Sequence, residues 1–168
     1  ADVWSLETEL IVPGETFTAS VLILEGNTLL AANPDGTGSV YVFERSGQVW
    51  ASKGNLGSGL SLPTTSRFGS AIALSGNTAF VGAPGNSQQP GRIYEFTRSA
   101  GEWSRTRTIV SPAGSVYDDF GRAIAFVGGS LVSGARQPAA LTPNPSTLPT
   151  TGRVYVFSFN MSSWTLVR

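Results

Sequence analysis

The chain has 168 residues, a formal net charge of zero, and neither cysteine nor histidine. These features exclude disulfides, thiol nucleophiles, histidine bases and the common zinc sites, and without a basic cluster we expect no nucleic-acid binding. No apolar run approaches the roughly 18 residues of a membrane helix, so we expect no membrane insertion, whereas 20 glycines, 10 prolines and 9 phenylalanines favour an all-β chain.

The first predicted element is a strand over residues 3–12. Its segment Trp4–Val12 resembles Trp103–Val110, which follows the second copy of a repeat found further along the chain. We therefore expect an extra outer strand with no sheet of its own, which could pair with the open edge of a neighbouring chain. The residues expected at that interface are Trp4, Leu6, Leu10 and Val12.

A Gly-x-x-Tyr-x-Phe motif then recurs three times, in Gly38–Phe43, Gly91–Phe96 and Gly152–Phe157, with a Trp seven residues after each Phe. Identical spacing in three places indicates an internal repeat, and the alternation of period two predicts strands. We expect the aromatic residues to fill the space between sheets rather than to bind a ligand, with each Trp N–H left for a carbonyl or water. These residues are Tyr41, Tyr94, Tyr155, Phe43, Phe96, Phe157, Trp50, Trp103 and Trp164.

A second motif precedes each Tyr-x-Phe strand and predicts two short strands around a tight turn. It reads Phe-Gly and then an apolar strand in Phe68–Pro84 and Phe120–Arg136, and it is degraded in Phe17–Asn33. We expect Gly69 and Gly121 to permit close backbone approach at the inner edge of each unit. Four antiparallel strands in about 50 residues are typical of propeller blades, here over residues 15–56, 66–110 and 118–168.

The segments Phe68–Pro84 and Phe120–Ala135 resemble FG-GAP repeats, which build the integrin α-subunit head and many secreted propellers. The resemblance implies a single propeller-type domain over residues 1–168: a β-propeller arc of three four-stranded antiparallel blades plus the extra N-terminal strand. It also implies an extracellular or cell-surface protein with a role such as cell adhesion. A chain that opens with Ala1 rather than Met is consistent with a removed leader or a cut longer chain.

Many FG-GAP repeats bind calcium through an Asp-rich loop between their first two strands. The turns at that place are Glu25–Asn27, Ser75–Asn77 and Gly128–Ser130, which are too short and too poor in acids to supply six or more oxygen ligands. We therefore expect no calcium there and no other cofactor.

Three aspartates remain as weak metal candidates. Asp35 lies in a Pro-Asp-Gly sequence, which favours an ordinary turn. Asp118 and Asp119 directly precede Phe120, where they could bind a cation or a ligand hydroxyl, or accept hydrogen bonds from nearby backbone N–H groups. Because adjacent side chains point apart on an extended chain, they make a poor catalytic pair.

The loop over residues 137–151 is rich in Pro, Ser and Thr and should be extended and exposed. It could contact a partner, carry O-linked sugar, or be a tolerated insertion. Its candidate O-glycosylation sites are Thr142, Ser146, Thr147, Thr150 and Thr151. Asn160 begins an Asn-Met-Ser sequon, which predicts N-glycosylation if the protein is a secreted eukaryotic glycoprotein.

Three blades are too few to close a propeller and would leave two apolar flanks. We therefore favour a non-enzymatic extracellular structural or assembly module, whose arc is completed by self-association or by a second chain into a ring or fibre. A fragment of a longer propeller would explain the same count. The alternative is a lectin-like or adhesin-like module that binds a glycan or an extracellular protein through its end loops, especially residues 137–151. No residue pattern indicates an enzyme.

Overall fold

The computed structural model describes residues 5–12, 14–15, 17–86, 88–137 and 151–167. This part of the chain is all β and has no helix, and so none that could cross a membrane. Its strands form three four-stranded antiparallel sheets, which confirms the all-β class and the four-stranded unit.

Each sheet is a meander whose strands pair in chain order. The first contains β1 (Val21–Glu25), β2 (Thr28–Asn33), β3 (Ser39–Ser46) and β4 (Val49–Asn55). The second contains β5 (Ala71–Ser75), β6 (Thr78–Ala83), β7 (Arg92–Ser99) and β8 (Glu102–Val110). The third contains β9 (Ala123–Val127), β10 (Ser130–Gln137), β11 (Thr151–Phe159) and β12 (Trp164–Leu166). All three sheets lie within the predicted units.

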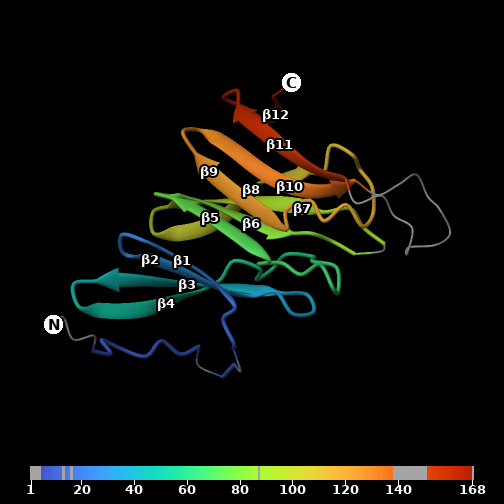
Figure 1. Ribbon diagram of the computed structural model, residues 1–168. Helices are drawn as coiled ribbons and strands as arrows, with labels where there is room; N and C mark the ends of the chain where they lie inside the picture. Colours follow the sequence, from blue (N-terminus) through green and yellow to red (C-terminus); the bar gives the residue numbers. More distant parts are fainter. Residues whose placement is uncertain (1–4, 13, 16, 87, 138–150, 168) are drawn as a thin grey trace.

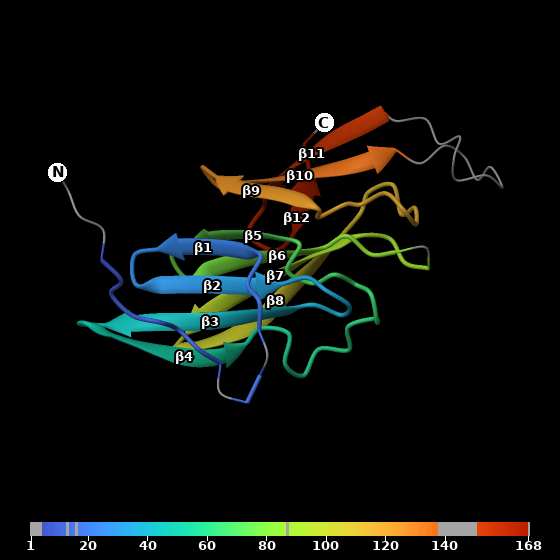
Figure 2. The same cartoon turned by 60° about the horizontal axis from the view of Figure 1, so that its bottom comes forward.

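The sheets stack face to face in chain order, with the first at the bottom and the third at the top of Figure 1, and Figure 2 shows the same order from another side. We call the face that a sheet turns toward the next sheet its forward face, and the opposite one its back face. Leu30 and Val40 on the forward face of the first sheet share a core with Val81, Tyr94 and Phe96 on the back face of the second. Alternation along each strand thus supplies both faces with apolar side chains.

The second and third sheets repeat this arrangement. Phe80 and Ile93 on the forward face of the second sheet share a core with Leu131, Tyr155 and Phe157 on the back face of the third. The aromatic residues of the Tyr-x-Phe strands are therefore buried on the back faces of their sheets.

The two Phe-Gly segments lie between successive sheets. Phe68 is fully buried and sits edge-on to Tyr94 and Phe96, with ring centroids 5.6 and 6.1 Å away. Phe120 does the same against Tyr155 and Phe157 at 5.9 Å. Each phenylalanine thus packs on the back face of its own sheet while its backbone touches the sheet before it.

That backbone contact requires glycine on the preceding sheet. A Cβ on Gly82 would overlap the carbonyl group of Gly121, and a Cβ on Gly91 would overlap the backbone of Phe120. On the third sheet, a Cβ on Gly134 would lie 3.7 Å from the Cβ of Ala123, which is an ordinary contact. The glycines of this pattern are therefore covered by incoming backbone on the second sheet, whereas Gly134 on the third sheet has no such contact.

The sequence predicts an extra strand over residues 3–12, but the structure of the N-terminal segment is different. Residues 5–12 form no strand. Instead Leu10 and Val12, together with Phe17, pack on the back face of the first sheet around Tyr41, and the Phe17 and Tyr41 rings lie edge-on at 4.7 Å. The prediction failed because the apolar side chains of the segment are buried against an open sheet face, which needs no strand pairing.

We expect Gly82→Ala and Gly91→Ala each to lower the free energy of unfolding by roughly 1–3 kcal/mol or more, because the overlapped atoms belong to backbone that cannot move aside. Gly134→Ala and Gly152→Ala are the matched controls on the third sheet, and each should change stability by less than about 0.5 kcal/mol. Urea unfolding of the four variants measures this difference. Equal losses at all four positions would contradict the backbone contact.

Candidate functional site

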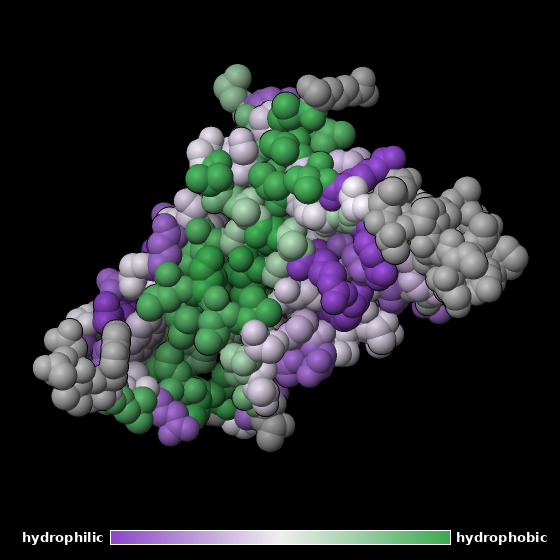
Figure 3. Space-filling view, viewed as in Figure 1, coloured by the Kyte–Doolittle hydropathy of each residue, from purple (hydrophilic) through white to green (hydrophobic). Residues whose placement is uncertain are grey.

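The forward face of the third sheet carries no further sheet in the described part of the chain. Its side chains alternate with the buried Leu131 and Phe157, and Val127 and Val154 are 72% and 71% exposed. In the strand register, Val132 lies opposite both Ala125 on β9 and Val156 on β11, so an apolar row crosses these three strands. Figure 3 shows apolar residues gathered in a band that runs from the first sheet up to the third.

A pocket of about 580 Å³ opens beside this face, over the start of β9 and the end of β10. It is lined by Asp119, Arg122, Ala123, Gly134, Ala135 and Arg136. On the second sheet, Gly82 holds the place of Gly134 in the repeat and is covered by the backbone of Gly121. The pocket therefore lies where a following Phe-Gly segment would sit.

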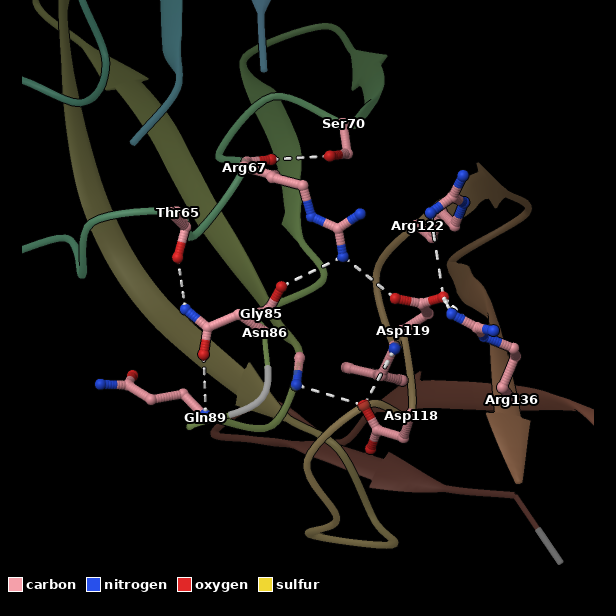
Figure 4. Close-up of polar contacts among 12 residues, drawn as sticks. Thr65, Arg67, Ser70, Gly85, Asn86, Gln89, Asp118, Asp119, Arg122 and Arg136 are labelled. Atoms are coloured by element: carbon pink, nitrogen blue, oxygen red, sulfur yellow. Dashed lines mark hydrogen bonds and ion pairs between the residues drawn. The ribbon is translucent and has the colours of Figure 1, made fainter. Parts of the chain in front are cut away.

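An ion cluster centred on Asp119 forms the polar side of the pocket (Figure 4). Asp119 Oδ1 accepts a hydrogen bond from Arg67 at 3.0 Å, and Oδ2 accepts one from Arg136 Nε at 2.7 Å. Arg122 lies 3.8 Å from the same Oδ2. One carboxylate shared by three guanidinium groups leaves a local excess of positive charge, and the Arg122 and Arg136 side chains are 62% and 64% exposed.

Asp118 points away from this cluster and is fully buried. Its Oδ1 accepts hydrogen bonds from the backbone N–H of Gly91 at 3.2 Å and of Phe120 at 3.1 Å. Of the two interpretations of the aspartate pair, the backbone-binding one fits this geometry. Asp118 fastens the Phe-Gly segment to the second sheet, and Asp119 fastens it to Arg67.

The described residues contain no group of three or more acidic side chains that could hold a metal ion. Asp35 is exposed in the loop after β2, where its N–H donates to Asn33 Oδ1 at 3.0 Å and its carbonyl accepts from the N–H of Gly38. These contacts belong to a turn.

A second set of polar contacts, which the sequence analysis missed, joins the third strand of one sheet to the third and fourth strands of the next. Glu44 accepts a hydrogen bond from Arg98 at 2.7 Å and one from Trp103 Nε1 at 3.4 Å. The repeat tryptophans were expected to donate to a carbonyl or water, whereas here the acceptor is a carboxylate of the preceding sheet. The available signal was an acidic residue within or directly after an otherwise apolar Tyr-x-Phe strand.

The next pair of sheets has a related contact, in which only the tryptophan comes from the following sheet. Glu95 is buried, and it accepts a hydrogen bond from Trp164 Nε1 at 2.9 Å and one from Arg107 at 3.0 Å. The third sheet has Val156 and Ser158 at the positions of Glu95 and Glu44 in the repeat. Its forward face therefore offers no carboxylate to a following tryptophan.

The other predicted site residues are dispersed. Leu10 and Val12 are half-buried on the first sheet, Leu6 is 85% exposed, and Trp4 lies outside the described residues. Asn160 is exposed in the turn after β11, and its Oδ1 accepts a hydrogen bond from the Ser163 N–H at 3.0 Å. Of the O-glycosylation candidates, Thr142, Ser146, Thr147 and Thr150 lie outside the described residues, and of Thr151 only its place at the start of β11 is described.

No protein-family model matches this chain, and no curated protein matches it. The resemblance to FG-GAP repeats thus depends on the motifs themselves.

The carboxyl group of Glu44 should make the free energy of unfolding depend on pH. Burial on its own would raise the pKa of Glu44, but hydrogen bonds from Arg98 and Trp103 outweigh burial and hold that pKa below its ordinary value of 4.5. The folded state therefore binds the proton less readily than the unfolded state, so the contribution of Glu44 is complete above pH 4.5 and is lost as the pH falls through the folded-state pKa.

We expect Glu44→Gln to lower the free energy of unfolding by about 1 kcal/mol at neutral pH and to have a smaller effect well below pH 4.5. Urea unfolding as a function of pH measures the difference. Glu102→Gln is the control, because Glu102 is exposed on β8. If the free energies of unfolding of wild type and Glu44→Gln differ by the same amount at neutral pH and well below pH 4.5, the lowered pKa of Glu44 is contradicted.

Removing Asp118 should damage the structure rather than a metal site. Asp118→Ala leaves the N–H groups of Gly91 and Phe120 without their acceptor, so we expect a loss of about 1–3 kcal/mol. Asp35→Ala, in an exposed turn, is the control and should change stability little. Unfolding with and without added calcium tests both points. A calcium-dependent gain in wild type that Asp118→Ala abolishes would contradict this role.

Proposed function

We propose that this chain is a non-enzymatic assembly module, an arc of β-propeller resembling FG-GAP repeats. Its forward end, on the third sheet, is completed by another polypeptide, either a second copy or a different chain. The observation that carries the proposal is the apolar forward face of that sheet, which no described residue covers. An extracellular setting follows only from the motif resemblance and is part of the proposal.

The first two forward faces support this interpretation. Each is covered by the back face of the next sheet, and each buries residues at the positions that Val132 and Val154 hold in the third sheet. Contiguous exposed apolar surface on a protein of this size marks an interaction site. The third forward face thus has the composition of an internal interface but lies on the outside.

The two ends of the stack differ. At the first sheet, Leu10, Val12 and Phe17 cover part of the back face, although Leu22 and Leu24 remain 63% and 60% exposed. At the third sheet no described segment plays this covering role. This asymmetry favours growth of the arc at the third sheet.

The alternative of a glycan- or protein-binding module has weaker support. It depends chiefly on the loop over residues 137–151, of which the structure describes only the two ends. A catalytic role lacks a candidate pair, because the hydrogen bonds of Asp118 and Asp119 already join neighbouring sheets.

Light scattering coupled to size exclusion, together with binding of a hydrophobic dye, tests the proposal. We expect either a native mass above 17.6 kDa, or a monomer that binds dye at the third sheet. Val154→Glu should abolish the extra mass or the dye signal, because a charge on this face opposes burial. Val49→Glu, at a valine that is 69% exposed on β4, is the matched control.

Two results would overturn the proposal. One is a wild-type monomer that binds little dye. The other is an equal effect of Val154→Glu and Val49→Glu, because the open face would then have no special role.

A further inference from the structure

The structure shows twice how a forward face receives the next unit. A segment that begins with Phe-Gly lays its backbone on glycines of the preceding sheet. Gly38 forms a parallel bridge with Phe68, and a Cβ on Gly38 would overlap the Phe68 backbone. At the next junction, Gly82 and Gly91 are covered by the backbones of Gly121 and Phe120. At the first junction Ala32 holds the place of Gly82, so the glycine that both junctions share is the one at Gly38 and Gly91, where the incoming backbone leaves no space for a side chain.

The third sheet repeats the receiving half of this contact. Gly134 precedes Ala135 as Gly82 precedes Ala83, and Gly152 begins the third Gly-x-x-Tyr-x-Phe strand as Gly91 begins the second. The nearest atoms to a Cβ added at Gly134 and at Gly152 would lie at 3.7 and 3.9 Å. The pocket of about 580 Å³ opens over Gly134. Within the described chain no contact requires glycine at Gly152, although its counterparts Gly38 and Gly91 both lie against incoming backbone.

The charge around the pocket indicates which Phe-Gly segment fits. At the second junction the incoming segment carries Asp119 directly before Phe120, and this carboxylate pairs with Arg67 of the sheet it joins. On the third sheet, the exposed arginines Arg122 and Arg136 line the pocket and share Asp119, so positive charge is in excess. An acidic residue before the Phe-Gly pair would find a partner there.

We propose that Gly134, Gly152, Arg122 and Arg136 form a socket for an acidic Phe-Gly segment. This deepens the proposed function, on which it rests, by naming the part of the partner that is recognised. The partner backbone would lie on the two glycines, its acidic side chain would face the two arginines, and its following strand would cover the apolar row of the third sheet.

The first repeat of a second copy fits this socket less well than a true Phe-Gly unit. Its corresponding pair is Phe17-Thr18. In the two occupied junctions the second residue is Gly69 or Gly121, with φ of 97° and 87°, a region that a β-branched residue avoids. A Cβ on Gly121 would also lie 2.6 Å from the carbonyl oxygen of Arg92. The occupant is therefore a true Phe-Gly unit and not the first repeat of a second copy.

The test uses the full-length chain and a synthetic peptide of residues 116–127, which carries Asp-Asp-Phe-Gly. We expect this peptide to shift the amide NMR signals of β9, β10 and β11 at up to millimolar concentration. Gly152→Ala should weaken binding by about tenfold or more while leaving the unfolding midpoint unchanged, since the added Cβ fits the isolated chain. Gly134→Ala should have a smaller effect, because Ala32 holds that place at the first junction. The same peptide with Gly121→Ala should bind wild-type protein as weakly as the unchanged peptide binds Gly152→Ala.

A second peptide isolates the charge. Residues 64–75 form a peptide of the same length that carries Ser-Arg-Phe-Gly, so its arginine would meet Arg122 and Arg136. It should bind more weakly than residues 116–127, and the difference should shrink at high salt. The proposal is overturned if the acidic peptide causes no shifts, or if Gly152→Ala binds it as well as wild type does.

The outcomes separate the socket from the assembly role. If the chain forms oligomers that Val154→Glu disrupts but does not bind the peptide, the assembly role is supported and the socket is contradicted. Peptide binding by a chain that never self-associates would keep the socket and exclude a second copy as its occupant.

Discussion

The contact between a Phe-Gly segment and the glycines of the sheet before it is the constraint on which this structure depends. The carbonyl group of Gly121 lies where a Cβ on Gly82 would be, so the second and third sheets meet backbone to backbone on the inner side. That approach places Phe120 between the sheets, where it is fully buried. A side chain at Gly91 would meet the backbone of Phe120, so it would separate the sheets and expose the apolar core between them.

A different chemistry joins the outer strands. There Glu44 accepts hydrogen bonds from Arg98 and Trp103 of the following sheet. Glu95 accepts one from Trp164 of the following sheet and one from Arg107 of its own sheet. Glycine brings the inner strands close, so β5 lies against both β1 and β9, whereas long polar side chains span the outer side. Hydrogen bonds from a charged arginine and a neutral tryptophan offset the free-energy cost of burying each carboxylate.

The two ends of the stack are unequal, and this inequality gives the molecule a direction. The N-terminal segment places Leu10, Val12 and Phe17 on the back of the first sheet, whereas the third sheet leaves a valine-rich face and two glycines uncovered by any described residue. A stack with one partly covered end and one open end is suited to joining a partner by its forward face. The proposed function and the proposed socket both follow from this asymmetry.

The sequence by itself determined the all-β class, the four-stranded unit and nearly all strand positions, because alternation, turn glycines and the Tyr-x-Phe spacing are local signals repeated three times. Only the tertiary structure decided which residues meet across sheets: Asp119 with Arg67 and Arg136, and Glu95 with Trp164. It also decided that residues 5–12 pack on a sheet face instead of forming a strand. Such contacts join residues distant in the chain, and they depend on which apolar face is left open, which no local pattern encodes.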